Sequence, residues 1–297
     1  MHPDLPSQVL ALDIDGTLLD QPLDFEAPIS DANLAALKDL VASGTRLLIS
    51  TGRNESSCLS VLERSGWDYL LECDRILQNG VIVKTAAGRV IAHNELDRRE
   101  AVRALDVYRA HGLCTMLFES YERGGACLME IEPAHPRLCK YLEMRRRENP
   151  APDALRLVPD LSAHLDRDIT ALGSIDTAER SAAACADIEA LGLKLSHAAK
   201  LKLVHRPGYA DGVFLELFSS KVGKHLAFAS YCEEMGFDPA RCAAIGDGGN
   251  DLELLKMVGA GIAMGNASED VKEAADHVAP HYTENGVATA IREHLLP

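Results

Sequence analysis

The sequence predicts an α/β fold, namely a Rossmann-like parallel sheet with helices on both faces, plus an inserted α+β cap domain. Short apolar runs alternate with amphipathic segments at both ends of the chain, which is typical of βαβ units. The middle has hairpin and strand patterns instead, and 297 residues are enough for two domains. We expect a core made of residues 1–85 and 209–297, with residues 86–208 as the cap.

The N-terminal part begins this alternation of strands and helices. The expected elements are, in order, a strand at 9–13, a helix at 30–44, a strand at 46–50 and a helix at 54–66. Leucines at helical spacing define one apolar stripe of the first helix. Ser30 or Asp31 caps this helix, and Gly44 ends it.

The middle of the chain has shorter and more varied patterns. A hairpin is expected at 81–93, where two apolar runs flank a turn that contains glycine. The elements that follow are a helix at 95–112, strands at 115–120 and 126–131, a helix at 135–148, a proline-rich surface loop at 149–160, a strand at 168–176, a helix at 179–192 and a strand at 199–208.

The C-terminal third again alternates strands and helices, as the N-terminal part does. Its expected elements are a strand at 213–218, a helix at 222–235, a strand at 242–247, a helix at 250–259, a strand at 260–265 and helices at 268–275 and 286–296. We assign the strand at 213–218 to the core, because helix and strand patterns alternate again from there to the end of the chain.

Composition limits the class of protein and its partners. Hydrophobic residues make up 47% and charged residues 25%, as in soluble globular proteins. Neither a membrane-spanning run nor a signal segment is present, so we expect a cytoplasmic protein without a membrane partner. The net charge of −15 argues against nucleic-acid binding. The eight cysteines lack CxxC spacing and are expected to be reduced thiols.

Two acidic clusters each follow a short apolar strand. In "VLALDIDGT", Asp13 and Asp15 are two positions apart and should point to one side of the strand. In "AAIGDGGND", Asp247 and Asp251 follow the second strand. The carboxyl ends of parallel strands meet at one edge of a sheet. We therefore expect these four residues to surround one divalent cation, Mg²⁺, because crowded carboxylates are costly without a positive charge between them.

Two further strand ends predict a phosphate site. "LLISTGR" places Thr51 and Gly52 at the start of a helix, where backbone N–H groups favour an anion. "SSKVGKHLA" follows another strand and supplies Lys221 or Lys224 as the positive charge. We favour Lys224, because it falls in the first turn of the expected helix.

Each motif also has a plain structural interpretation. "DIDGT" alone is an ordinary turn, and "GDGGND" alone is a helix cap in which Asn250 or Asp251 meets backbone N–H groups. The ordered combination, with each piece after an apolar run, is far more specific.

Arg145–Arg147 form either a solvated helix face or an anion contact for a substrate. His197 and His205 lack metal-ligand partners at suitable spacing and are expected to be surface or cap residues.

With these motifs the chain resembles the haloacid dehalogenase-like superfamily, specifically its Cof-type phosphatase branch with a large α+β cap. The matching pieces are "DIDGTLL", "STGR", "QNG", "SSKVGKHLA", "GDGGNDLELL", "GIAMGNA" and "NGVATAI". They cover the expected core, whereas the middle matches only in size and position. Two departures are His225, which stands where the family usually has a small residue, and Ser50 in place of the usual alanine.

The resemblance implies a Mg²⁺-dependent phosphatase with an aspartyl-phosphate intermediate. Asp13 matches the nucleophile and Asp15 the general acid and base. The implied metal ligands are Asp13, the backbone carbonyl of Asp15, Asp247 and the supporting Asp251. The implied phosphate-binding residues are Thr51, Gly52, Lys224 and Asn250.

The expected partner is a small phosphorylated metabolite, with sugar phosphates as the leading class, and the cap is expected to select it. Two alternatives stay open at this point. A phosphosugar mutase uses the same fold, although the fourth motif here lacks the longer insertion that we associate with that type. A non-catalytic phosphate sensor would tolerate loss of the nucleophile or of its partner acid, and both are present.

Overall fold

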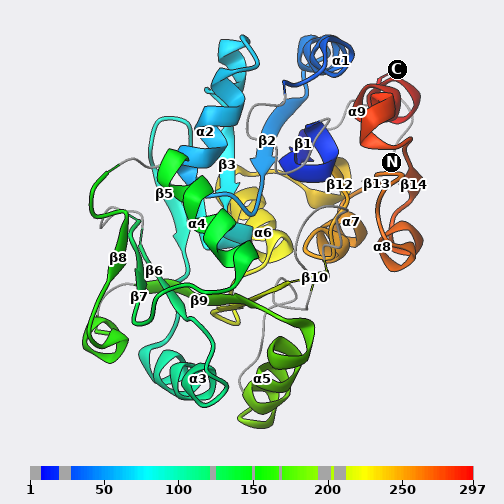
Figure 1. The fold of residues 1–297 in the computed structure, drawn as a ribbon. Coiled ribbons are helices and arrows are strands. Elements are labelled where there is room, and N and C mark those ends of the chain that lie inside the picture. Colours follow the sequence, from blue (N-terminus) through cyan, green and yellow to red (C-terminus); the bar gives the residue numbers. More distant parts are fainter. Residues whose placement is uncertain are drawn as a thin grey trace. The chain divides into compact units, whose positions relative to one another are not determined.

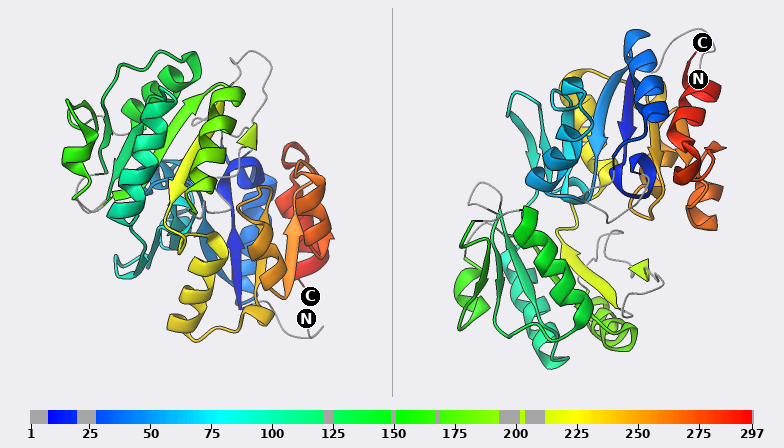
Figure 2. Two further views of the ribbon diagram at one scale, coloured as in Figure 1. Left: turned by 90° about the horizontal axis from the view of Figure 1, so that it is seen from below. Right: turned by 45° about the horizontal axis from the view of Figure 1, so that its top comes forward.

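The computed structural model describes residues 8–19, 28–120, 125–148, 151–166, 169–192, 202–203 and 212–296. It divides the chain into two compact units (Figure 1). The core unit consists of Met1–His93 and Gly223–Pro297, and the insert unit consists of Asn94–Val222. Each unit is built on its own sheet, one of eight strands and one of six (Figure 2).

The core unit contains an eight-stranded sheet of order β14-β13-β12-β1-β2-β3-β4-β5. Its strands are β1 (Val9–Leu12), β2 (Arg46–Ser50), β3 (Asp74–Leu77), β4 (Ile82–Lys84), β5 (Val90–His93), β12 (Ala243–Gly246), β13 (Ala260–Ala263) and β14 (His277–Val278). The six strands from β14 to β3 are parallel, and β4 and β5 add an antiparallel hairpin at one edge. Because β1 lies between β12 and β2, the residues that follow these three strands meet at one sheet edge.

Helices cover both faces of the core sheet. They are α1 (Asp31–Ala42), α2 (Glu55–Glu63), α6 (Lys224–Met235), α7 (Leu252–Met257), α8 (Glu269–Ala274) and α9 (Gly286–Ala290). Val9 and Ala11 of β1 pack in one apolar cluster with residues of α6, α7 and α8. On α1, the side chain of Ser30 caps the helix by accepting a hydrogen bond from Asn33 N, which decides between the two expected caps. The Asn33 carboxamide in turn accepts a hydrogen bond from Ala288 N of α9.

The insert unit contains a six-stranded sheet of order β10-β11-β9-β6-β7-β8. Its elements are α3 (Arg98–Ala110), β6 (Met116–Glu119), β7 (Cys127–Met129), α4 (Pro136–Glu148), β8 (Leu155–Leu157), β9 (Ile169–Asp176), α5 (Ala178–Ala190), β10 (Lys202–Leu203) and β11 (Val213–Phe218). All described pairings are antiparallel except β7 with β8. Leu215 and Leu217 of β11 lie in an apolar cluster with residues of α3 and α5.

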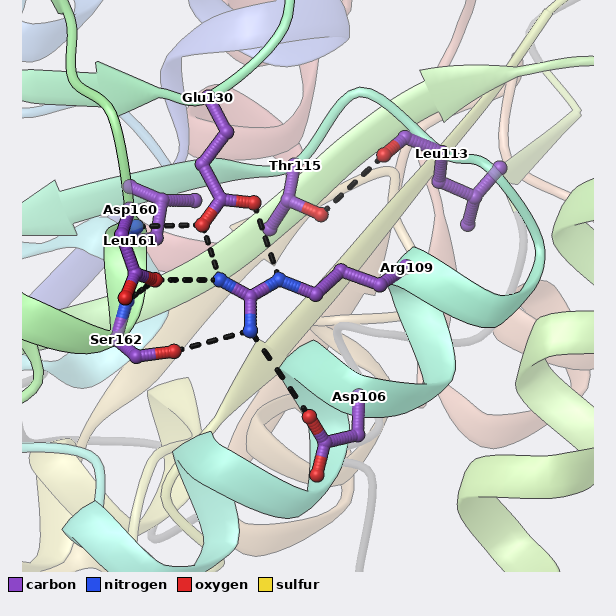
Figure 3. Close-up of polar contacts among 8 residues, drawn as sticks. All are labelled: Asp106, Arg109, Leu113, Thr115, Glu130, Asp160, Leu161 and Ser162. Carbon is purple, nitrogen blue, oxygen red and sulfur yellow. Dashed lines mark hydrogen bonds and ion pairs between the residues drawn. The ribbon is translucent and has the colours of Figure 1, made fainter.

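One arginine joins three parts of the insert unit (Figure 3). The guanidinium of Arg109 on α3 donates to Glu130, to Asp160 and to the hydroxyl of Ser162. Glu130 also accepts a hydrogen bond from the backbone N–H of Leu161. These contacts tie α3 to the segment after β7 and to the turn after β8. The Arg109 side chain is 36% exposed, so solvent screens the ion pairs and the network serves mainly to fix local geometry.

The expected domain borders after residues 85 and 208 differ from those in the structure. Residues 90–93 form β5, which pairs with β4 in the core sheet, so the expected hairpin is correct but lies wholly in the core unit. The strand expected at 213–218 exists as β11, but it pairs with β9 in the insert sheet. Its assignment to the core is wrong, because an apolar run indicates a strand without indicating its partner.

Other differences from the expected elements are smaller. Strand β3 was not expected, and β8 lies within the segment expected to be a loop. Helix α6 begins at Lys224 rather than at 222, because Gly223 is its extended N-cap. The strand expected at 199–208 is described only as the two residues of β10. All eight cysteines are free thiols, as expected. Within the described residues, no helix has the length and apolarity needed to cross a membrane.

Candidate active site

Three carboxylates meet at the carboxyl edge of the core sheet. Asp13 directly follows β1, Asp247 directly follows β12, and Asp251 directly precedes α7. One oxygen from each lies within 4.8 Å of the other two. A hydrogen bond of 3.1 Å from Asp13 N to the carbonyl of Ile245 continues the pairing of β1 with β12 and fixes this arrangement. The sequence-based expectation that these three residues come together is therefore met by the geometry.

These carboxylates have the chemistry of a site for a hard divalent cation. Mg²⁺ prefers oxygen ligands and is commonly bound through carboxylates together with substrate phosphate. Asp13 and Asp251 are 6% and 2% exposed, so their negative charges are poorly solvated. A bound cation would relieve the repulsion among the three groups. The donor set therefore fits the cation that the sequence predicts.

Lys224 supplies a positive charge within the same cluster. It is the first residue of α6, and its buried Nζ lies 2.9 Å from Asp13 Oδ1 and 2.6 Å from Asp251 Oδ1. Burial alone would lower the pKa of Lys224, but the two carboxylates outweigh burial and raise it above its ordinary value. Lys221, by contrast, is exposed in the insert unit. Of the two lysines, Lys224 is the one that contacts the acidic cluster.

Asp13 has an unusual protonation equilibrium. Burial raises its pKa to about 8, and the carboxylates of Asp251 and Asp247 act in the same direction, although Lys224 opposes them. The charged form of Asp13 is thus costly when only protein groups surround it. This is a second indication that the cluster is built to meet a cation, because a bound cation stabilises the deprotonated carboxylate.

Asp15 lies differently from our expectation. Strand β1 ends at Leu12, and a turn containing Gly16 at a φ of 77° follows, so Asp13 and Asp15 do not share a strand face. The Asp15 carboxylate instead accepts two hydrogen bonds from Arg53, of 2.8 Å from Nε and 2.6 Å from Nη2. It is not one of the three clustered acids. The expectation that four carboxylates surround one cation is therefore wrong for the Asp15 side chain.

Close approaches at two glycines allow the acids to pack. A Cβ atom on Gly16 would lie 2.4 Å from Asp247 Oδ2, and one on Gly246 would lie 2.4 Å from Asp251 Cγ. Asn266 fixes Asp247 further, because its Nδ2 donates to Asp247 Oδ2 at 3.0 Å and to the Gly16 carbonyl at 2.9 Å. Only glycine fits the two backbone positions without displacing the carboxylates.

The residues expected to bind phosphate come from the neighbouring strand ends. Thr51 and Gly52 follow β2, and the Thr51 hydroxyl accepts a hydrogen bond from Arg53 N at 3.1 Å. Asn250 lies beside Asp251, before α7, and its Nδ2 donates to Asn79 Oδ1 at 2.8 Å. Asn79 in turn lies against Gly52, since a Cβ on that glycine would be 3.0 Å from Asn79 Oδ1. Asn79 therefore connects Asn250 to the Thr51–Gly52 loop.

Sequence reasoning did not give roles to three residues that contact the expected site. They are Arg53, Asn79 and Asn266, and each lies in a motif that carries the family resemblance: "STGR", "QNG" and "GIAMGNA". Their partners are distant along the chain, so spacing alone could not reveal the contacts. The available signal was their place in motifs that match the family.

The arginine run lies at the end of α4 in the insert unit. Arg145 lies over the rings of Phe118 and Tyr141 within the insert unit, at 5.1 and 5.9 Å from their centroids. Arg146 and Arg147 are exposed. His197 and His205 lie outside the described residues.

Comparison with known proteins assigns the chain to a family. A family model described as haloacid dehalogenase-like hydrolase matches residues 10–291. The chain belongs to this family. The haloacid dehalogenase-like assignment agrees with the parallel core sheet and with the acidic cluster at its carboxyl edge.

Individual relatives align along almost the whole chain. Phosphatase YwpJ of Bacillus subtilis is 27% identical, with 97% of this chain and 100% of the relative covered. A 5-amino-6-(5-phospho-D-ribitylamino)uracil phosphatase of the same organism, YitU, is 25% identical, with 97% of each chain covered. A solved haloacid dehalogenase-like hydrolase from B. subtilis is 25% identical at a TM-score of 0.73, covering 97% of this chain and 100% of its own.

Proposed function

We propose that this chain is a Mg²⁺-dependent phosphatase that hydrolyses small phosphorylated metabolites through an acyl phosphate of Asp13, an aspartyl-phosphate intermediate. The observation that carries the proposal is the convergence of Asp13, Asp247, Asp251 and Lys224 at one sheet edge. Phosphoryl transfer depends mainly on positioning and charge neutralisation. Asp13 supplies the nucleophilic carboxylate, Lys224 supplies positive charge, and Asp247 and Asp251 would hold a cation that supplies more.

The first half of the reaction transfers the phosphoryl group to Asp13. A carboxylate oxygen of Asp13 forms a bond to phosphorus, and the bond from phosphorus to the leaving oxygen breaks. Asp15 gives its proton to that leaving oxygen, which departs as an alcohol. The second half reverses these roles. Asp15 takes a proton from water, the water oxygen attacks phosphorus, and the phosphate leaves Asp13 as a free carboxylate.

The surrounding groups neutralise charge on the transferring phosphoryl group. The proposed phosphate contacts are the Thr51 hydroxyl, the Gly52 backbone, the Asn250 amide and Lys224. The proposed cation-binding groups are Asp13, the Asp15 backbone carbonyl, Asp247 and Asp251. When bound, Mg²⁺ supplies positive charge that screens the negatively charged substrate from the acidic cluster.

We further propose a sugar-like or polyol-like phosphate as the substrate class. The name of the YitU relative supports this choice, because its substrate carries phosphate on a ribityl chain. We assign selection of the organic part to the insert unit, acting as a cap. In such an arrangement specificity depends on the inserted segment, whereas the chemistry depends on the core.

The test is a phosphate-release assay on p-nitrophenyl phosphate and a panel of phosphorylated metabolites. We expect turnover with Mg²⁺ and its loss after exhaustive treatment with EDTA. Ca²⁺ should compete with Mg²⁺ but support little turnover, since its looser and higher coordination is unsuited to in-line geometry. Full activity after chelation would contradict the role of the metal. Binding of the panel without any phosphate release would favour a sensor, and isomerised phosphosugars would favour a mutase.

A further inference from the structure

One turn of the core unit contacts several of the elements to which we assign phosphate binding. It spans Gln78–Gly80 and joins β3 to β4. Its three residues have positive φ values of 49°, 59° and 103°. For residues with side chains this conformation costs on the order of 1 kcal/mol each, and it persists only where the surrounding structure holds it. The "QNG" turn is therefore a strained segment with a fixed geometry.

The turn first supports the Thr51–Gly52 loop. Asn79 N donates to the Thr51 carbonyl at 3.1 Å, and Gln78 N donates to the Arg53 carbonyl at 2.9 Å. The Asn79 carboxamide covers Gly52, because a Cβ there would lie 3.0 Å from Oδ1 and 3.4 Å from Nδ2. Backbone and side chain thus both fix the position of the loop.

The same turn also contacts Asn250 and the start of α6. Asn79 Oδ1 accepts the hydrogen bond of 2.8 Å from Asn250 Nδ2. Gly80 packs against the residue before Lys224, since a Cβ on Gly80 would lie 2.6 Å from the Gly223 carbonyl oxygen. Asn79 itself is 8% exposed. One buried side chain is thus central to a turn that contacts the ends of β2 and β12 and the start of α6.

We propose that Asn79 is a positioning residue for the phosphate site and that it acts through Asn250. A carboxamide nitrogen carries two N–H groups. When one of them is bound to Asn79 Oδ1, the amide plane of Asn250 is fixed and its second N–H is left for a substrate oxygen. The backbone N–H of Asn79, which a side-chain substitution leaves in place, bonds to the Thr51 carbonyl and supports the loop separately. This assignment rests on the proposed phosphatase function.

The substitution Asn79→Gly isolates the side chain, because glycine adopts positive φ without strain. We expect kcat/KM for p-nitrophenyl phosphate to fall by about tenfold to a hundredfold, as for other groups that orient a contact residue. The inhibition constant of inorganic phosphate should rise at least about fivefold, because a misplaced Asn250 contacts phosphate less well.

The matched control is Asn285→Gly, at another asparagine with positive φ, 56°, whose backbone bonds to Tyr282 and Thr289. It should leave both constants unchanged.

A double-mutant cycle separates positioning from a purely structural role. Because Asn79 acts through Asn250, the double variant Asn79→Gly with Asn250→Ala should lose no more activity than Asn250→Ala alone. Fully additive losses, or an Asn79→Gly enzyme identical to the control, would overturn the inference. If Asn79→Gly does not fold, Asn79→Ala replaces it in the cycle, since alanine also removes the carboxamide oxygen that accepts the hydrogen bond from Asn250. A wild-type chain that releases no phosphate would contradict the proposed function rather than this role.

Discussion

Lys224 and Lys221 lie close together in the sequence, but their surroundings differ completely. Lys224 is fully buried between Asp13 and Asp251, whereas Lys221 is exposed. We expect Lys224→Ala to lower kcat/KM by about a hundredfold or more, the cost of one charged transition-state contact. Lys221→Ala should cost less than about fivefold, as for an exposed charge. Steady-state kinetics of both variants test the assignment, and a larger loss for Lys221→Ala would refute it.

Arg53 holds the carboxylate to which we assign proton transfer. Its guanidinium donates twice to Asp15 and is itself fixed by the Ser57 hydroxyl at 2.9 Å. We expect Arg53→Ala to slow hydrolysis of an alkyl phosphate at least about tenfold more than that of p-nitrophenyl phosphate, because a poor leaving group needs the proton most. The exposed Arg64 provides the control variant Arg64→Ala, for which the two substrates should behave alike. Equal losses with both substrates would contradict the role in proton delivery.

At the residue scale the sequence was most informative about side chains that directly follow apolar strands. Asp13 and Asp247 could be placed because each ends such a run, and Lys224 because it opens a helix after one. The contacts of Asp15 could not be predicted, since its side chain direction depends on the turn at Gly16 and on an arginine 38 residues away. Turn geometry of this kind has no periodic signature in the sequence.

Strand β11 shows the same limit at the scale of elements. Its apolar pattern predicted a strand correctly, but its partner is β9 rather than a strand of the core. A parallel core strand and a strand at the end of an insertion are both apolar, so composition does not separate them. Glu216 was an informative irregularity, because a charged residue within the apolar run is unusual for a parallel strand buried on both faces.

Glu216 predicts a pH dependence of stability. Burial raises its pKa from 4.5 to about 7, although Arg145 opposes the shift. Between these values the folded chain holds a proton that the unfolded chain has lost, so this residue's contribution to stability falls as pH rises. Glu216→Gln should therefore match the wild-type melting temperature at pH 5 and exceed it by a few degrees at pH 8. The same difference at both pH values would show that Glu216 does not titrate in this window.

At the scale of the whole molecule, the order of motifs along the chain gave the α/β core and the position of the insertion. The domain borders fall after residues 93 and 222 rather than after 85 and 208, because β5 extends the core sheet and β11 extends the insert sheet. Strand pairing is a long-range property, and local patterns do not encode it. The acidic cluster was nevertheless predictable, because parallel strands bring distant sequence motifs to a single edge.

Asp13 is the proposed nucleophile, and the proposed mechanism depends on it more than on any other residue. The direct test compares wild-type protein with Asp13→Asn in phosphate release from p-nitrophenyl phosphate with Mg²⁺, after thermal melting has shown that both are folded. An amide cannot form the acyl phosphate, so we expect turnover to fall by several orders of magnitude, about 10³-fold or more. Brief reaction followed by acid quenching should leave phosphate bound to the wild-type chain and none to the variant. A folded Asp13→Asn protein with turnover within tenfold of wild type would contradict the account.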